Sequence, residues 1–276
     1  MIYITAQNKK IPALGYGTWQ LKGTDCSKGV AKALEIGYRH IDTAQIYENE
    51  AEVGAGIAAS GVKRDDIFLT TKVWITELHD GALQKSVDVS LKKLKVDHVD
   101  LLLIHWPVTE VPFAEQMKAL QSVQKSNKTS LIGVSNYTIA QMKEVVETLG
   151  TKVVTNQVEY HPYLSQKPLL DYLHAHNMFL TAYCPLARGN VANDQVLSKI
   201  AAKHGKTNGQ VTLRWLVQQK GVAAIPKSAS EKHIRENFDI FDFALDAEEM
   251  NAISALARPD GRLVNPGFAP KWDRAA

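Results

Sequence analysis

The sequence predicts an α/β protein of the (β/α)8 TIM-barrel class, with a short N-terminal β-hairpin and an irregular C-terminal tail. Eight short apolar or β-branched runs recur along the chain, and stretches with helical periodicity separate them, which is the pattern of parallel strands joined by helices. The length of 276 residues is close to the roughly 250 that one such barrel needs. We therefore expect residues 1–276 to form a single domain.

A hairpin is expected to precede the barrel, because Ile2 to Ile11 is strand-like on both sides of a turn near Asn8. The barrel strands are predicted at residues 13–17, 38–43, 67–72, 99–104, 131–135, 153–158, 179–183 and 222–226. The segment 258–276 contains Pro259, Pro266 and Pro270, so we expect it to be the irregular tail.

The segments between these runs show the periodicity of amphipathic helices. Apolar residues share one helix face in three of them: Leu83, Val87, Leu91 and Leu94; Phe113, Met117 and Leu120; and Ile139, Met142 and Leu149. We expect Asp25 to cap the first helix, Gly37 to follow its end and Thr138 to cap the fifth. Helical stretches at 193–204 and 208–219 both precede the last strand, so one of them is an addition to the eightfold scheme.

Composition and charge exclude several classes of protein. With 45% apolar and 22% charged residues, the sequence is typical of a globular protein. The formal net charge of +3 is small, and the densest basic run, Lys92, Lys93 and Lys95, falls on the solvated face of a predicted helix. A nucleic-acid-binding surface would need clustered Lys and Arg. We therefore expect no nucleic-acid partner.

Cysteine usage and the N-terminus point to the cytoplasm. The two cysteines, Cys26 and Cys184, form no CxxC pair, which argues against a disulfide framework and against a thiolate zinc site. The sequence has no 18-residue apolar run, and its first residues do not resemble a signal peptide. We expect a cytoplasmic protein without membrane association, and nothing in the sequence requires more than a monomer.

Nearly every predicted strand ends in a residue that could bind or react. In chain order these are Thr18, Trp19, Asp42, Lys72, His105, Ser135, Asn136, Gln157, Tyr183, Lys227 and Ser228. Each residue alone is weak evidence, since Asp42 could be a helix cap, His105 a core histidine and Lys72 a surface lysine. The active site of a barrel lies at the C-terminal ends of its strands, so the whole series predicts one site at that rim.

Four side chains near this rim could together reduce a carbonyl group. Hydride delivery to the carbonyl carbon requires a proton for the developing alkoxide, and Tyr47, five residues after Asp42, could donate it. An ammonium about 4 Å away contributes on the order of 4 kcal/mol, which would lower the pKa of a tyrosine by up to about three before desolvation is subtracted. Lys72 could supply this charge, Asp42 could keep Lys72 protonated, and His105 could orient the substrate oxygen as a neutral imidazole.

Motifs of other enzyme classes are absent or misplaced. No GxGxxG motif follows a strand, and the sequence has no Walker or HExxH motif. His174 and His176 are two apart in a predicted helix and point to different sides, so we expect no metal pair there. Ser135 lacks the GxSxG surroundings of an acyl-transfer nucleophile. A metal-dependent barrel hydrolase would need several ligands at strand ends, where only Asp42 and His105 are placed, and we expect no metal.

The chain resembles an aldo-keto reductase over essentially its whole length. The matching stretches are GYRHIDTA at 37–44 followed by Tyr47, TKVW at 71–74, LIHWP at 103–107, GVSN at 133–136, NQVEYHP at 156–162 and IPKS at 225–228. The resemblance implies a catalytic tetrad of Asp42, Tyr47, Lys72 and His105, with Tyr47 as the general acid. It also implies that Ser135, Asn136 and Gln157 hold the nicotinamide carboxamide, that Tyr183 stacks on the nicotinamide ring, that Lys227 and Ser228 bind the 2′-phosphate, and that Glu236 and Asn237 contact the adenine.

The resemblance implies NADPH as the cofactor, with one departure from the family pattern. His233 stands where many members place an arginine that clamps the 2′-phosphate, and Arg235 is two positions away. A histidine is only partly charged at neutral pH. We therefore expect NADPH to be preferred and NADH to remain usable.

The substrate is expected to be a small carbonyl compound. Trp19, Trp74 and Trp106 suggest an aromatic collar around the substrate, for which packing of the rim is the alternative explanation. The compact loops and residues 261–266 are similar to bacterial 2,5-diketo-D-gluconate reductases and methylglyoxal-reducing relatives, which favours dicarbonyls, 2-keto esters and aldehydes. The alternative function is a non-catalytic binding subunit that senses nicotinamide on the same fold, although retention of the whole tetrad argues against it.

Overall fold

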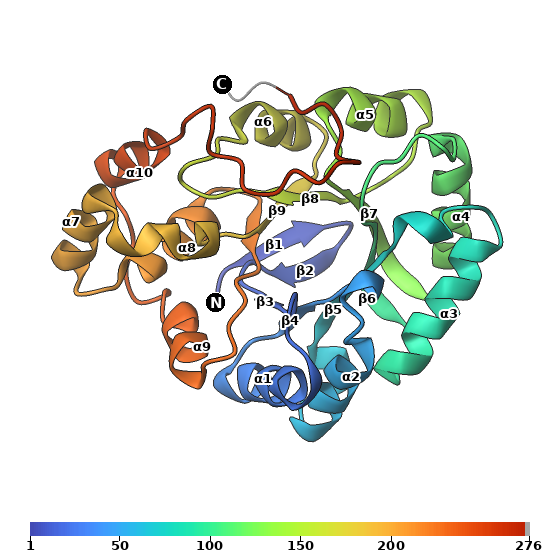
Figure 1. Ribbon diagram of the computed structural model, residues 1–276, viewed down its shortest axis with the longest axis horizontal. Coiled ribbons are helices and arrows are strands. Elements are labelled where there is room, and N and C mark those ends of the chain that lie inside the picture. Colours follow the sequence, from blue (N-terminus) through green and yellow to red (C-terminus); the bar gives the residue numbers. More distant parts are fainter. Residues whose placement is uncertain (274–276) are drawn as a thin grey trace.

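The computed structural model, which describes residues 1–273, contains a parallel sheet curled inside a ring of helices (Figure 1). The sheet consists of β3 (Tyr16–Gly17), β4 (His40–Asp42), β5 (Phe68–Val73), β6 (Val99–Ile104), β7 (Thr129–Ser135), β8 (Thr155–Glu159), β9 (Phe179–Tyr183) and β10 (Val222–Ala224), paired in chain order. At the seam, Leu14 bridges Ala224 and the amide of Gly15 donates to the carbonyl oxygen of Ala224, so the first and last strands meet. This arrangement is consistent with the predicted (β/α)8 barrel.

All eight predicted strands are present, and both strands at the seam are shorter than predicted. The run 13–17 contains a two-residue strand, and the run 222–226 ends at Ala224, just before Pro226, which has no amide proton to donate to a ladder. The strands approach closely at this seam, because a Cβ atom on Gly17 would lie 2.7 Å from the carbonyl oxygen of Ile225. Glycine at this position therefore allows the sheet to close.

The helices surround the sheet and bury their apolar faces against it, as Leu83, Val87, Leu91 and Leu94 do. They are α1 (Gly23–Ile36), α2 (Glu50–Ala59), α3 (Ala82–Leu94), α4 (Phe113–Lys125), α5 (Ile139–Lys143), α6 (Lys167–Ala175), α7 (Gln195–His204), α8 (Asn208–Gln218), α9 (Glu231–Phe238) and α10 (Ala247–Ser254). As predicted, both α7 and α8 precede the last strand.

Two of the three predicted helix boundaries are confirmed. Gly37 ends α1 with a positive φ of 127°, and the Thr138 side chain accepts a hydrogen bond from the amide of Gln141. The prediction for Asp25 is wrong, because α1 begins at Gly23 after Lys22 at the N-cap position. Asp25 instead lies in the first turn, where its carboxylate faces the positive end of the helix dipole.

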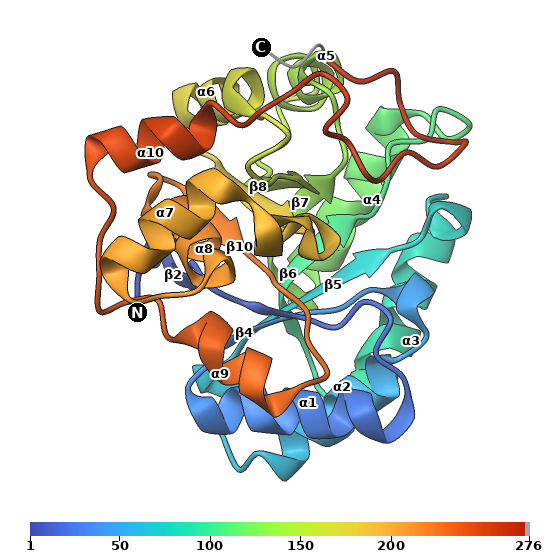
Figure 2. The same ribbon diagram turned by 60° about the vertical axis from the view of Figure 1, so that its left-hand side comes forward.

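The N-terminal hairpin fills one end of the barrel. Strands β1 (Tyr3–Ala6) and β2 (Lys9–Pro12) are joined by Gln7 and Asn8, both with positive φ, as a tight hairpin turn requires. The hairpin residues Ala6 and Ile11 pack in one apolar cluster with Phe68, Leu101, Leu103, Leu131, Val154 and Phe179. Figure 1 shows the hairpin behind the open end of the barrel, and Figure 2 shows it on the side away from the C-terminal segment.

The chain crosses the other end of the barrel after α10. Residues 258–273 form neither helix nor strand and run over the mouth beside α5 and α6 (Figures 1 and 2), as predicted for the tail; the last three residues of that prediction lie outside the described part. Within residues 1–273, no helix is long and apolar enough to cross a membrane.

Candidate active site

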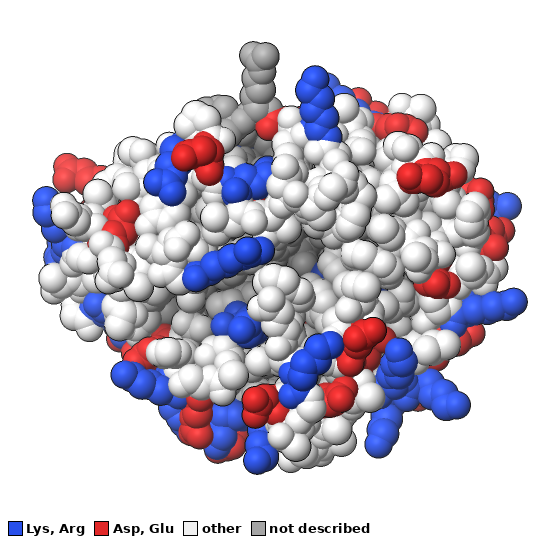
Figure 3. All heavy atoms as spheres, in the orientation of Figure 1, with Lys and Arg blue, Asp and Glu red and all other residues white. Residues whose placement is uncertain are grey.

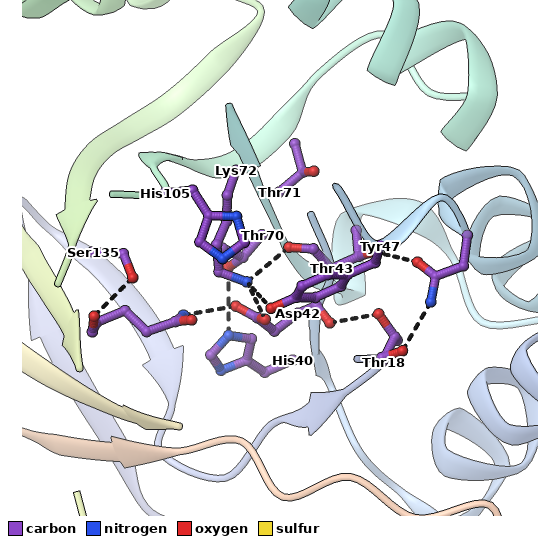
Figure 4. A network of polar contacts seen from close by, with 12 residues as sticks. Thr18, His40, Asp42, Thr43, Tyr47, Thr70, Thr71, Lys72, His105 and Ser135 are labelled. Atoms are coloured by element: carbon purple, nitrogen blue, oxygen red, sulfur yellow. Dashed lines mark hydrogen bonds and ion pairs between the residues drawn. The ribbon is translucent and has the colours of Figure 1, made fainter. Parts of the chain in front are cut away.

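Four of the side chains singled out in the sequence meet at the mouth of the barrel (Figure 4). Asp42 ends β4, Lys72 is the penultimate residue of β5, His105 follows β6, and Tyr47 lies in a short 3₁₀ helix, η1 (Gln45–Tyr47). The Nζ atom of Lys72 donates to Oδ1 of Asp42 at 2.5 Å and to the carbonyl oxygen of Thr43 at 2.9 Å. The same Nζ lies 3.3 Å from the phenol oxygen of Tyr47. The sequence prediction therefore identified four groups that share one location.

The loop carrying Tyr47 is fixed by Asn49, a residue that the sequence reasoning did not find. The Asn49 side chain is buried; its Nδ2 donates to the carbonyl oxygens of Thr18 and Leu21, and its Oδ1 accepts from the hydroxyl of Thr43. These bonds join the loops after β3 and β4. In the sequence, an asparagine just before a helix is indistinguishable from an ordinary cap.

Burial decides the protonation state of the histidine and of the lysine. Burial, and then the positive charge of Lys72, lowers the pKa of His105 well below its ordinary value, so the imidazole is neutral at physiological pH. Burial also lowers the pKa of Lys72, and the Asp42 carboxylate opposes that shift. The ion pair is almost completely enclosed, with side-chain exposures of 0% for Lys72 and 2% for Asp42.

The expectation that Lys72 makes Tyr47 a stronger acid is wrong. Burial, followed by the negative charge of Asp42, raises the pKa of Tyr47 well above its ordinary value. The physical reason is that complete burial disfavours the charged form of the phenol, and that the negative charge of Asp42 offsets part of the effect of the Lys72 charge. Tyr47 consequently keeps its proton throughout the neutral pH range.

Amide and hydroxyl groups form a second wall beside these four side chains. Gln157 Nε2 donates to Oδ2 of Asp42 at 2.8 Å, and the hydroxyl of Ser135 donates to the carbonyl oxygen of Gln157 at 2.8 Å. Asn136 Nδ2 donates to the carbonyl oxygen of His105 at 3.0 Å, and the phenol of Tyr183 donates to Oδ1 of Asn136 at 2.8 Å. The polar groups at the ends of β7, β8 and β9 are therefore ordered by one another.

A cleft of about 660 Å³ opens next to these groups, in the hollowed face of the molecule in Figure 3. Of the residues predicted for the cofactor, Asn136, Gln157, Tyr183 and Lys227 line it. Four others do not: Ser135 is fully buried, Ser228 accepts a hydrogen bond from the amide of Ser230, and Glu236 and Asn237 lie in α9. The structure thus brings half of the predicted set to the cleft wall.

The three predicted tryptophans all line this cleft, but they differ in their surroundings. Trp19 is 39% exposed at the rim, where the Arg188 guanidinium lies 5.6 Å from its ring centroid. Trp74 and Trp106 pack edge-on against Phe268 of the tail, with ring centroids 5.8 and 5.4 Å away. The sequence analysis did not identify Arg188 or Phe268 as neighbours of the site. For Phe268, the signal in the sequence was an aromatic residue in a proline-containing tail.

The cleft has the donor set and the backbone of a nucleotide site. Arg188 and Lys227 are exposed cations at its edge, Leu186, Ile225 and Pro226 supply apolar surface, and amides border the neutral imidazole. Four non-glycine residues in the segments that follow β7 and β9 have positive φ: Asn136, Cys184, Ala187 and Arg188. Such backbone is costly and typically occurs at functional sites. The residues present therefore fit a nicotinamide dinucleotide, whose charged phosphates and flat apolar ring need these two kinds of surface.

A parallel barrel with a protonated phenol, an ion-paired lysine and a neutral imidazole beside such a cleft defines an NAD(P)H-dependent oxidoreductase. The aldo/keto reductase family model matches residues 13–258, and the chain belongs to this family.

Individual relatives match the chain over almost its entire length. The methylglyoxal reductase DkgB of Salmonella typhimurium is 45% identical over 267 residues, which are 95% of this chain and 99% of that protein. A crystal structure of a protein provisionally named 2,5-diketo-D-gluconic acid reductase B has a TM-score of 0.96 at 50% identity and covers 98% of this chain and 97% of its own. A variant of Gox0644 in complex with NADPH has a TM-score of 0.90 at 35% identity, with 96% of each chain covered.

Proposed function

We propose that the protein uses NADPH to reduce small aldehydes, ketones and dicarbonyl compounds to alcohols, with Tyr47 as the proton donor. The observation that carries this proposal is the position of the Tyr47 phenol, 3.3 Å from Lys72 Nζ and packed edge-on to the neutral imidazole of His105 with ring centroids 5.7 Å apart. A proton donor, a cation that stabilises its conjugate base and a neutral hydrogen-bonding group are the three parts that carbonyl reduction needs.

Different residues around the cleft would bind different parts of the cofactor. Asn136, Gln157 and Tyr183 would hold the nicotinamide, which supplies a hydride to the carbonyl carbon when it is bound. Lys227 would face the 2′-phosphate, with Ser228, Glu236 and Asn237 beside the adenosine. NADH would bind more weakly than NADPH, because Lys227 would have no 2′-phosphate to pair with.

Tyr47 and His105 would bind the carbonyl oxygen between them, and the proton would pass from the Tyr47 hydroxyl to that oxygen as negative charge develops. An alkoxide is a far stronger base than a phenolate, because the pKa of an alcohol lies far above that of a phenol. Transfer from the phenol therefore remains favourable although burial has raised its pKa. Lys72 would then stabilise the tyrosinate, and Asp42 would hold Lys72 in place.

Small dicarbonyls are the proposed substrates because the cleft is walled by tryptophan rings and the relatives named above include a methylglyoxal reductase. Trp74 and Trp106 supply flat apolar surface beside His105, as a short aldehyde or ketone requires. The function is tested by following NADPH and NADH oxidation side by side with methylglyoxal and a panel of simple aldehydes and ketones. Absence of turnover across the panel, with NADPH still bound, would favour the alternative of a nicotinamide-sensing subunit.

Replacing Lys227 by alanine tests the cofactor preference. We expect affinity for NADPH to fall by at least roughly tenfold while affinity for NADH changes little, because a charge-assisted hydrogen bond to a phosphate contributes about 1.5 kcal/mol or more. Dissociation constants from fluorescence titration provide the measurement. Lys220→Ala, at an exposed lysine before β10, is the matched control. Equal losses for both cofactors would show that Lys227 does not read the 2′-phosphate.

A further inference from the structure

Glu159, the last residue of β8, is a fully buried carboxylate that the proposed chemistry does not use. Its Oε1 accepts from the backbone amide of Leu263 at 2.7 Å, and its Oε2 accepts from the amide of Val264 at 2.9 Å. Its Oε1 is also 2.9 Å from Nε2 of the fully buried His161. The carboxylate thus joins the end of a barrel strand to the backbone of the tail, more than 100 residues later in the chain.

The tail segment held by Glu159 leads directly into the wall of the cleft. Val264 lines the cleft. Four residues further, Phe268 packs edge-on against Trp74 and Trp106, which line it too. Trp272 packs against Trp106 with ring centroids 6.0 Å apart. The tail therefore completes an aromatic surface that begins on the barrel, and it does so over the mouth seen in Figure 2.

Residues 258–273 contain no helix or strand, and beyond the hydrogen bond from the amide of Arg258 to the carbonyl oxygen of Tyr163, the position of this wall depends mainly on contacts with side chains. Aromatic packing alone allows sliding, whereas two backbone hydrogen bonds to a single buried carboxylate fix both position and orientation. Burying a carboxylate costs several kcal/mol unless strong hydrogen bonds compensate for its lost hydration. A carboxylate retained here, with two backbone donors supplied by the tail, is a specific attachment point.

We propose that Glu159 is a positioning residue of the carbonyl pocket: it anchors the backbone of Leu263 and Val264, and so places Val264 and Phe268 opposite Trp74 and Trp106. The inference rests on the proposed carbonyl reduction and explains how the enzyme would select its substrates. With the tail anchored, the pocket accepts short carbonyl compounds and excludes bulky ones. Glu159 itself does not touch the substrate.

The variant Glu159→Gln tests the anchor with little change in volume. An amide has one acceptor oxygen where the carboxylate has two, so either Leu263 or Val264 would present its N–H to the NH2 group. We expect the ratio of kcat/KM for methylglyoxal to that for 2-naphthaldehyde to fall by at least about fivefold, which corresponds to roughly 1 kcal/mol. The change should come through KM, with kcat for methylglyoxal nearly constant and NADPH affinity unchanged.

Glu249→Gln is the matched control for a merely structural role. Glu249 is also a buried carboxylate, with 7% side-chain exposure, bonded to His204 at 3.0 Å and to the amide of Asp246, and it does not line the cleft. We expect this variant to lose stability without a change in the substrate ratio. The proposal would be overturned if Glu159→Gln, like Glu249→Gln, lowered the melting temperature without changing the ratio of kcat/KM for the two substrates.

Amide hydrogen exchange in the unmodified protein tests the anchor without any variant. The amides of Leu263 and Val264 should exchange far more slowly than other amides of the tail, and exchange as fast as that of their neighbours would contradict the proposal. This measurement also separates the two proposals. If no carbonyl compound were turned over, the proposed function would be wrong, and so would substrate selection through Glu159. If carbonyl compounds were turned over but the amides of Leu263 and Val264 exchanged rapidly, only the proposed role of Glu159 would be overturned.

Discussion

Tyr47→Phe is expected to lower kcat for carbonyl reduction by about 10²- to 10⁴-fold, the range that loss of a positioned proton donor typically costs. The ring remains and only the hydroxyl next to Lys72 is removed, so the Lys72–Asp42 pair and the packing against His105 should persist. Single-turnover reduction of methylglyoxal at saturating NADPH gives the rate. NADPH binding, measured by fluorescence, should be nearly unchanged.

The matched control is Tyr160→Phe, which removes a tyrosine hydroxyl that is hydrogen-bonded to Gln219 at 2.7 Å and does not line the cleft. We expect a small loss of stability and normal turnover from this variant. If Tyr47→Phe turned over like the parent, Tyr47 would not be the acid, and proton delivery would have to come from another group. Loss of NADPH binding in the same variant would instead indicate a role in cofactor binding.

The sequence could predict that the site residues lie together, because the ends of neighbouring parallel strands lie at the same rim of the barrel. The register places Gly17 opposite Asp42 and Ser135 opposite Gln157, so residues at successive strand ends reach the same rim. Periodicity and apolar runs fix where a strand ends to within a residue or two. That accuracy is sufficient to place Lys72 and His105 at the mouth.

The parts that could not be predicted depend on contacts between distant segments. The carboxylate of Glu159 and the amides of Leu263 and Val264 are joined only in the folded chain, and no local pattern relates them. The prediction that the pKa of Tyr47 is lowered was wrong for a related reason. The direction of this shift depends on the complete burial of the phenol and on the charge of Asp42 beside Lys72, and only the folded structure specifies both.

Replacing Lys72 by methionine is expected to reduce the free energy of unfolding by about 3–5 kcal/mol, because it leaves the carboxylate of Asp42 buried without its cation. Carbonyl reduction should fall at least as far as in Tyr47→Phe, since no charge would then stabilise a tyrosinate. Urea denaturation measures the first effect and NADPH oxidation the second. Lys167→Met, which breaks an exposed pair with Asp171, should change neither appreciably.

The double variant Lys72→Met/Asp42→Asn separates the cost of an unpaired charge from the loss of packing. An asparagine at position 42 carries no charge, so the double variant should be more stable than Lys72→Met alone. Activity should stay low in both, because neither has a cation beside Tyr47. Recovery of stability without recovery of turnover would show that the unpaired charge of Asp42 destabilises Lys72→Met, and that turnover requires Lys72 itself. If the double variant were as unstable as the single one, the penalty would come from packing of the lysine stem instead.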